Sequence, residues 1–425
     1  MKQTKRKKLS DLFRHPELIC ILFMGIACGF PLALTASTLK TWLSEHSISM
    51  REIGAFAFVA IPYSIKFLWS PFIDGIKLPF LQKKMGQRRS WLLVVQILLS
   101  VAVFALANIK PENSLLICAG IATVVAFLSA TQDIIVDAYR IERLSDDIQP
   151  MGVTMYIYGY RIGLYMAGAI LLVIADYSNW NYAYYAAAVI MAMSIIVTLI
   201  CSEPKHLREK AVNKILSYTE HLHSIVIKPF LNLITMKDWQ YLLLFIVLFK
   251  LGDALAGNLT NPFLIKTGFT KTEIALIVKT YGLPATLFGT FLGGVIAHRF
   301  GLIKSLLFAG IIQMLSNVMF IVQDQVGHNN AMLTATILIE NISGSIGDVV
   351  FVGYISSMCN KKFAATQYAL FSSIATTGRN LISGSSGFIV DDYGWSIFFL
   401  VSIIAALPGI LLIFKIRHIK KPKEI

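Results

Sequence analysis

The chain has 425 residues, of which 56% are hydrophobic and 15% are charged, and its net charge is +14. Its mean hydropathy of +0.66 excludes a soluble domain of this size, so the bilayer is the solvent in which the fold must be explained. The basic residues lie between long apolar runs, so a nucleic-acid partner is not expected.

Twelve apolar runs are long enough to span a bilayer, and they predict an all-α integral membrane protein. They begin near residues 17, 53, 90, 114, 151, 181, 239, 273, 303, 331, 364 and 395. Basic residues gather at both termini and in the loops after even-numbered runs, whereas the opposite loops hold only Lys40, Arg51, Lys110, Lys266 and Lys271. The positive-inside rule therefore predicts that both termini are cytoplasmic.

The first run follows a basic segment, as in a signal peptide, but no small-x-small cleavage site follows it. We therefore expect it to be a spanning helix, bent at Pro31 as other runs are at Pro62 and Pro284. The five cysteines are scattered and form no CxxC motif, so neither a disulfide nor a metal site is predicted.

A polar signature follows the second run and is echoed after the eighth. Asp74 precedes Gly86, Arg88 and Arg89, and Gly293-Gly294 precedes Arg299. The pattern resembles the loop signature of the major facilitator superfamily, with an insertion between Asp74 and Gly86. We predict a conformational latch, in which the acid and the glycines hold the helices while basic residues meet helix ends; its members are Asp74, Gly86, Arg88, Arg89 and Arg299.

The fourth run contains two acids, Asp133 and Asp137. One aspartate in the middle of a bilayer costs roughly 3 kcal/mol, so two of them need a function. Their i, i+4 spacing places both on one helical face, with Arg140 one turn further along. That face must line a protein interior or a water-filled path, which indicates transport.

Several other polar residues lie within the predicted spans and are candidates for substrate binding: Lys66, Gln132, Tyr160, Arg161, Lys250, Asp253, Asn341 and Arg379. Arg161 is the best carboxylate anchor, because a guanidinium can bind an anion through two hydrogen bonds. Alternatively, Arg161 only neutralises an acid of the fourth run. Lys250 and Asp253 are also spaced to form a local ion pair, and Gln132 and Asn341 to orient the acids beside them.

The two halves of the chain resemble each other. The same spacing separates Asp133 from Asp348 and Trp180 from Trp395. The repeat predicts two parallel six-helix bundles, residues 1–201 and 239–425, joined by a cytoplasmic linker, residues 202–238, and this arrangement is the major facilitator architecture. The linker is basic and contains His221 and His223, which could bind a metal, but without a cluster of further ligands an amphipathic helix on the inner leaflet is favoured.

The repeat also separates the candidates for proton coupling, which are Asp133, Asp137 and Glu340. Asp133 is matched by Asp348, which suits a structural role, whereas Val352 occupies the position equivalent to Asp137. A unique acid suits coupling, so the sequence favours Asp137 as the proton carrier.

Several longer motifs identify a family. They include Gly29-Phe-Pro-Leu-Ala-Leu, Pro62-Tyr-Ser-Ile-Lys-Phe-Leu-Trp-Ser-Pro71, Gln132-Asp-Ile-Ile-Val-Asp-Ala-Tyr-Arg140, Gly159-Tyr-Arg-Ile-Gly163, Lys250-Leu-Gly-Asp-Ala254, Glu340-Asn-Ile-Ser-Gly344 and Ala365-Thr-Gln-Tyr-Ala-Leu-Phe-Ser-Ser373. These motifs closely resemble those of the AmpG-type muropeptide permeases, although Cys28 and Phe30 replace a common Ser and Leu.

The resemblance implies proton-driven import of N-acetylglucosaminyl-1,6-anhydro-N-acetylmuramic acid, with or without its peptide, across a bacterial inner membrane. The expected partners are this small molecule, protons and membrane lipid, with no cofactor and no metal, and the protein is expected to be a monomer. Two alternatives stay open, namely transport of another anionic conjugate such as a coenzyme A ester, and a sensor that no longer transports. An enzyme is not expected, because the chain lacks a GxSxG elbow, an HExxH motif, a P-loop and a dinucleotide fingerprint.

Overall fold

The computed structural model describes residues 15–45, 48–112, 114–204, 218–383 and 386–419. Within these residues the regular structure is helical throughout. The first half of the chain forms α2 (Pro16–Ala33), α3 (Leu39–Glu45), α4 (Met50–Ala55), α5 (Ile61–Ile65), α6 (Ser70–Gly75), α7 (Leu81–Met85), α8 (Gln87–Ala107), α9 (Leu115–Arg143), α10 (Gln149–Tyr177) and α11 (Trp180–Ile200).

The linker contributes α12 (Tyr218–Ile234), which is tied to the second half because Gln367 donates to the carbonyl of Pro229 at 3.1 Å. Residues 205–217 of the predicted linker, and the side chains of His221 and His223, lie outside the described part. The second half forms α13 (Trp239–Leu248), α14 (Leu251–Lys266), α15 (Lys271–Ile277), α16 (Leu283–Phe300), α17 (Leu302–Ser316), α18 (Val318–Val326), α19 (Asn330–Ser357), α20 (Ala364–Ser383), α21 (Ser386–Tyr393) and α22 (Trp395–Ile416).

Ten helical segments among the described residues are long and apolar enough to cross a membrane. The second predicted span is instead divided into shorter helices, α4 to α6, and the eleventh contains α20 and α21. Interrupted helices at membrane depth need neighbouring helices to satisfy their backbone groups. The twelve-span, all-helical fold class is confirmed, with its second span built from pieces.

Irregular turns lie beside the three prolines that were expected to bend their spans. A π-helical turn, Leu34–Thr38, follows Pro31, and another, Val278–Gly282, precedes Pro284. A 3₁₀ turn, Phe56–Ala60, precedes Pro62. Proline removes a backbone donor, and the helix accommodates this loss by local rewinding. The turns beside Pro62 and Pro284 fall in corresponding spans of the two halves, the second and the eighth.

Glycines let α2 and α10 pack with their backbones in contact. A Cβ atom added at Gly29 would lie 2.0 Å from the carbonyl oxygen of Tyr160, and one added at Gly159 would lie 1.9 Å from that of Leu22. Any larger residue would push the two helices apart. This close packing fixes the part of α10 that carries Tyr160 and Arg161.

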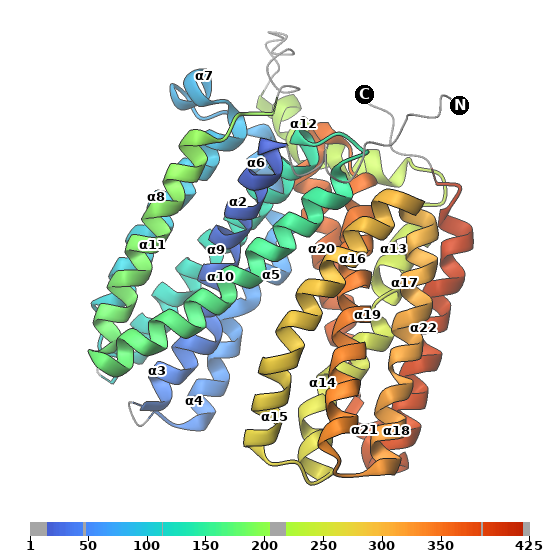
Figure 1. The fold of residues 1–425 in the computed structure, drawn as a ribbon. Coiled ribbons are helices and arrows are strands. Elements are labelled where there is room, and N and C mark those ends of the chain that lie inside the picture. The colour runs from blue at the N-terminus through green and yellow to red at the C-terminus, as the bar shows by residue number, and fades with distance from the viewer. Residues whose placement is uncertain (1–14, 46–47, 113, 205–217, 384–385, 420–425) are drawn as a thin grey trace.

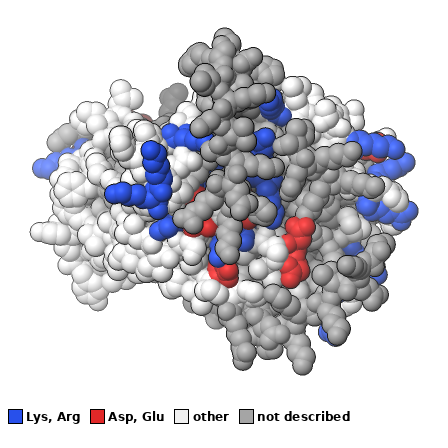
Figure 2. Space-filling model, turned by 90° about the horizontal axis from the view of Figure 1, so that it is seen from above, with Lys and Arg blue, Asp and Glu red and all other residues white. Residues whose placement is uncertain are grey.

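The helices form two groups that meet at one end of the molecule (Figure 1). Helices α2 to α11 lie on one side and α13 to α22 on the other, and the groups diverge toward the end that carries α3, α4 and α15. We call this the α15 end and the opposite one, where α7 and α12 lie, the α12 end. Figure 2 looks onto the α12 end, where Lys and Arg side chains are spread widely and Asp and Glu are fewer.

A disulfide corrects the expectation that none would form. Cys20 of α2 is bonded to Cys201, which directly follows α11, and their Cα atoms are 6.0 Å apart. The two residues are separated by 181 positions in the sequence, so no local motif could indicate their pairing. The bond joins two helices of the same group.

Candidate functional site

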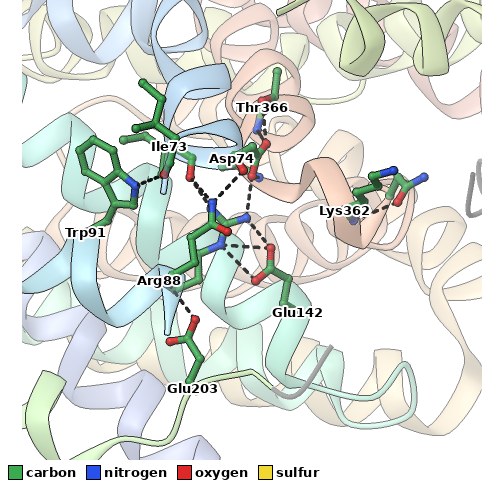
Figure 3. Close-up of polar contacts among 12 residues, drawn as sticks. Ile73, Asp74, Arg88, Trp91, Glu142, Glu203, Lys362 and Thr366 are labelled. Atoms are coloured by element: carbon green, nitrogen blue, oxygen red, sulfur yellow. Dashed lines mark hydrogen bonds and ion pairs between the residues drawn. The ribbon is translucent and has the colours of Figure 1, made fainter. Parts of the chain in front are cut away.

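A buried ion-pair network closes the α12 end (Figure 3). Arg88, in the first turn of α8, donates to Asp74 at 2.6 Å and through Nε to both carboxylate oxygens of Glu142 at 3.0 and 3.1 Å. All three side chains are at most 3% exposed. The charges therefore satisfy one another rather than water, which a buried arginine requires.

Asp74 also reaches the other group of helices. Its carboxylate accepts from the backbone N–H of Thr366 at 2.8 Å and from the Thr366 hydroxyl at 2.6 Å. Thr366 lies in the first turn of α20, where backbone N–H groups have no partner within the helix. An acid at this position also interacts favourably with the helix dipole. Asp74 thus caps a helix of the opposite group.

The remaining predicted latch residues, Gly86, Arg89 and Arg299, lie in different surroundings. Arg89 donates to the carbonyls of Thr198 and Leu199 at 2.8 and 2.7 Å, where α11 ends. Gly86 has a φ of +88°, and an added Cβ would lie 2.2 Å from the side chain of Glu203. These two residues therefore hold α8 against α11 within one group, as helix-end contacts of the predicted kind.

Glu203 completes this corner and was not a sequence candidate. Its carboxylate accepts from the backbone N–H groups of Arg88 and Arg89 at 2.8 and 3.1 Å. Burial raises the pKa of Glu203 above its usual value, against the lowering effect of these hydrogen bonds. Its place just after an apolar run made it look like an ordinary loop charge.

Arg299 lies outside the ion-pair network of Asp74, Arg88 and Glu142. Its side chain is exposed at the end of α16, and the contact between the groups comes from His298, whose Nδ1 lies 2.9 Å from the carbonyl oxygen of Asp147. Both residues line a pocket of about 310 Å³ between the helix groups. None of the predicted binding residues lines this pocket, so it belongs to the closure.

A second contact between the groups lies deeper and centres on Arg140, which is fully buried. Its guanidinium donates to Asp137 at 3.1 Å and to the hydroxyl of Ser356 on α19 at 3.1 Å. It also lies 5.5 Å from the ring centroid of Tyr156 and 5.4 Å from that of Tyr368 on α20. Asp137 therefore holds a cation that clamps the two groups together.

Arg161 lies on α10 in the first group, but its electrostatic partners lie on α19 in the second. They are Glu340 and Asp348. The acid on α9 that sequence reasoning considered as its alternative partner, Asp137, is instead bound by Arg140. Arg161 is partly exposed, and its neighbour Tyr160 packs against the ring of Tyr156 with centroids 5.9 Å apart.

The acids of the second group surround one lysine. Lys250, between α13 and α14, lies 2.9 Å from Asp253 and 3.0 Å from Asp348. The local pair with Asp253 matches its predicted spacing, and Asp348 is an additional partner. Arg379 of α20 also interacts electrostatically with both acids. Asp348 nonetheless keeps 40% of its side chain exposed, so this cluster faces an accessible space.

Glu340 and Asn341 lie next to this cluster on α19. Asn341 donates to Glu340 at 2.9 Å and accepts from the hydroxyl of Thr286 at 3.0 Å. Its amide is therefore engaged by protein groups and orients the acid, which is one of the two roles that the sequence allowed. Glu340 also interacts electrostatically with Lys250 and Arg161.

Asp133, one turn before Asp137 on α9, has a different environment. It is 5% exposed, and its carboxylate is hydrogen-bonded by the thiol of Cys28. Lys66, which is 9% exposed, acts electrostatically on Asp133 and on Asp137 as well. Gln132 beside it donates to the carbonyl of Ala27 at 2.6 Å. One oxygen of Asp133 has no hydrogen-bond partner among the described residues.

Sequence reasoning missed the residues that complete these networks: Glu142, Glu203, Ser356, Thr366 and Tyr368. Thr366 carried a usable local signal, because a threonine at the start of an apolar run is typical of a helix N-terminus. The others lie in helices or loops whose partners are distant in sequence.

Family models match each half of the chain. Residues 17–199 match the model described as Acetyl-coenzyme A transporter 1, and residues 242–425 match that of the Major Facilitator Superfamily. Among solved structures, the proton:xylose symporter XylE bound to 6-bromo-6-deoxy-D-glucose has a TM-score of 0.68 at 13% identity, with 97% of each chain covered. The human organic anion transporter MFSD10 has a TM-score of 0.69 at 11% identity, covering 93% of this chain and 98% of that one. These structures show the shared fold.

Curated relatives match nearly the whole chain. A Rickettsia conorii protein named putative transporter AmpG 4 is 38% identical over 408 residues, covering 96% of this chain and 98% of the relative. The anhydromuropeptide permease of Escherichia coli K12 is 36% identical over 409 residues, covering 96% of this chain and 81% of the relative. The chain has membrane-crossing helices in two groups, with buried charges between the groups, and it is similar to these relatives over nearly its whole length. It therefore belongs to the AmpG family of major facilitator transporters, which are permeases and not enzymes.

Proposed function

We propose that this protein imports anhydromuropeptides across the bacterial inner membrane by proton symport. Such a ligand carries sugar hydroxyls, amides and carboxylates, so its site needs cations and hydrogen-bonding groups within the membrane. The relative in Escherichia coli is named for anhydromuropeptide transport, and its similarity covers almost all of this chain. The site residues supply the matching chemistry.

The observation that carries the proposal is the exposure of Asp348. A carboxylate in a spanning helix with 40% of its side chain exposed needs a polar surrounding, and Lys250, Arg161 and Arg379 provide it from both helix groups. In this arrangement the arginines are available to an incoming carboxylate, which competes with Asp348 for them. Arg161 and Arg379 are therefore the proposed anchors.

The conformation of the structure can be assigned from which end is closed. Several hydrogen bonds between the helix groups lie toward the α12 end, including those from Thr366 to Asp74 and from Arg140 to Ser356. The basic side chains of that end support a cytoplasmic location for it (Figure 2). On this assignment the structure is outward-facing and ready to receive a periplasmic ligand.

A second candidate is a coenzyme A ester, which is favoured by one observation. The first half of the chain matches the Acetyl-coenzyme A transporter 1 model. A coenzyme A ester is also anionic and would use the same arginines, although its phosphates are more highly charged than a peptide carboxylate.

Uptake into membrane vesicles separates the two candidates. Right-side-out and inside-out vesicles containing the protein are given labelled anhydromuropeptide or labelled acetyl-coenzyme A, with and without an imposed pH gradient. We expect anhydromuropeptide to accumulate in right-side-out vesicles when the outside is more acidic. Accumulation of acetyl-coenzyme A alone would contradict the proposal, and so would muropeptide uptake that ignores the pH gradient.

A further inference from the structure

One face of α9 carries buried polar atoms that have no partner among the described residues. Ser129, Gln132 and Asp133 follow at i, i+3 and i+4, so their side chains share that face. Ser129 Oγ, Gln132 Oε1 and Asp133 Oδ1 are buried and receive no hydrogen bond of good geometry, and neither does the hydroxyl of Tyr63 on α5, whose polar neighbours are Ser129, Thr35 and Asp133. Unpartnered groups of this kind are costly in an apolar interior, so four in one place need an occupant.

These four atoms lie together. Tyr63 interacts with both Ser129 and Asp133. Gln132 and Asp133 both reach Cys28 of α2, and the amide nitrogen of Gln132 donates to the carbonyl of Ala27, which leaves its oxygen as the free atom. The set is therefore enclosed by α2, α5 and α9 within the first helix group.

The chemistry of the set matches water. Gln132 Oε1 and an ionised Asp133 can only accept hydrogen bonds, whereas the hydroxyls of Tyr63 and Ser129 can also donate. A buried water makes about three hydrogen bonds and can donate two and accept two. A metal cation is disfavoured, because the ammonium of Lys66 already acts on Asp133.

Comparison with the second group shows what is special about this acid. Asp348 of α19 corresponds to Asp133, and it is neutralised at 3.0 Å by Lys250, which lies on the first spanning segment of its group. In the first group, the corresponding neighbour of Asp133 is the uncharged thiol of Cys28. Asp137 has its own arginine at 3.1 Å. Asp133 is thus the acid of α9 without a direct ion pair in the described structure.

The charged and titratable groups that act on Asp133 lie on α9 itself and on the helices packed around it. They are Cys28 of α2, Tyr63 and Lys66 of the second span, Asp137 of α9, Tyr156 and Tyr160 of α10, and Tyr368 of α20. The tyrosines and the thiol are neutral donors, so Lys66 and Asp137 are the groups that set the local charge.

We propose that Tyr63, Ser129, Gln132 and Asp133 form an internal hydration site and that Asp133 takes up the transported proton through it. This inference rests on the proposed proton symport and assigns to Asp133 the role for which the sequence favoured Asp137. A hydronium at the site transfers its proton to Asp133 Oδ1, which forms one O–H bond and leaves a neutral water. Release reverses the step, with the proton passing to water on the cytoplasmic side. Asp137 stays paired with Arg140 throughout.

The test uses the full chain reconstituted in proteoliposomes, with three measurements on the same samples. The first is exchange of labelled for unlabelled anhydromuropeptide at equal pH, the second is accumulation under an inward proton gradient, and the third is the pH-dependent infrared band of buried carboxyl groups. The variants are Asp133→Asn, Asp137→Asn and Ser129→Ala. Ser194→Ala is the matched control, because Ser194 is a buried serine of the same group whose hydroxyl already donates to Met191 at 2.6 Å.

We expect Asp133→Asn to retain exchange, lose accumulation and lose one carboxyl band. Ser129→Ala should shift that band and slow proton-driven uptake about tenfold, as expected for one lost hydrogen bond. Asp137→Asn should reduce exchange and accumulation together, because it releases Arg140. Ser194→Ala should behave like the wild type.

Each contrary result has one meaning. Accumulation by Asp133→Asn together with exchange without accumulation by Asp137→Asn would overturn the assignment while leaving the proposed function intact. If the wild type does not exchange anhydromuropeptide, the proposed function fails, and the infrared band still decides on the site. A band that Asp133→Asn removes and Ser129→Ala shifts supports the hydration site, and an unchanged spectrum overturns it.

Discussion

Single residues of similar type have different roles here because of the side chains that they face. Arg140 is completely buried, and its guanidinium contacts Asp137, Ser356 and two tyrosine rings. Arg161 is partly exposed and faces acids of the opposite helix group. The first is therefore suited to holding the closed end, and the second to exchanging an internal acid for a ligand.

We expect Arg161→Gln to weaken binding of a carboxylate-bearing muropeptide more than that of a neutral disaccharide. One charged hydrogen bond contributes about 1.5–3 kcal/mol, so KM for the carboxylate ligand should rise by about tenfold to a hundredfold. Initial rates of uptake over a range of ligand concentrations measure this. Arg299→Gln is the control, since Arg299 is exposed at the end of α16. An equal rise in KM for both ligands would contradict a carboxylate anchor.

The candidate site was predictable from sequence only as far as local spacing reaches. The pair of Lys250 with Asp253 follows from i, i+3 spacing, and the buried acids of α9 follow from their cost in an apolar run. The partner of Arg140 on α19 could not be predicted, because Ser356 is a common helix residue far along the chain. Whether Asp137 or Asp133 carries the proton stays a prediction.

At the scale of elements, the structure depends on helix ends and on close helix packing. The start of α20 is capped by Asp74 from the opposite group, so one carboxylate connects a helix terminus with the closure of the molecule. The glycine contact of α2 with α10 instead holds two helices of one group together. The first contact must break during transport, and the second has no reason to.

We expect Asp74→Asn to shift the protein toward its inward-facing state. Loss of a charged helix cap costs about 1 kcal/mol or more, which changes the ratio of the two states about fivefold to tenfold. Labelling of a cysteine introduced at Thr154, which contacts Gly294 across the closed end, measures that ratio. Asp391→Asn, an exposed acid of α21, should leave the labelling rate as in the unsubstituted background. A labelling rate unchanged by Asp74→Asn would show that the cap does not control closure.

Gly29→Ala is expected to destabilise the first group by about 1–3 kcal/mol, the usual cost of overpacking. The added methyl group would lie 2.0 Å from the carbonyl oxygen of Tyr160. The matched control is Gly168→Ala on α10, where nothing lies within 4 Å of an added Cβ. The measurement is the thermal midpoint in detergent. Equal midpoints for the two variants would argue against the packing role.

At the scale of the whole molecule, hydropathy and charge placement determined most of the fold. Twelve apolar runs and alternating basic loops predicted the helices and their number, because a bilayer permits few other solutions. The interruption of the second span was not predicted in detail, since it depends on neighbouring helices that satisfy the freed backbone groups. The bond between Cys20 and Cys201 likewise depends on tertiary contact alone.

The disulfide leads to a prediction for the transport cycle. Cys20 and Cys201 lie in one helix group, whereas alternating access moves one group against the other. Oxidising or reducing this pair should therefore change the rate of uptake by no more than about twofold. A disulfide between cysteines introduced at Asp74 and Thr366 should abolish uptake. Vesicle uptake before and after treatment with a thiol oxidant measures both. Strong inhibition of uptake when the native pair is oxidised, if it is absent in Cys20→Ser, would contradict rigid-body motion of the groups.

The four membrane-embedded charges beside the hydration site also have an electrical consequence. Lys66 and Arg140 balance Asp133 and Asp137, so the set is neutral when all four are ionised and carries one positive charge once a proton is bound. Moving one elementary charge through a potential of 100 mV corresponds to about 2.3 kcal/mol. An interior-negative voltage should therefore accelerate import of an uncharged ligand, whereas a ligand with a single carboxylate cancels the added charge and should enter at a rate that is indifferent to voltage.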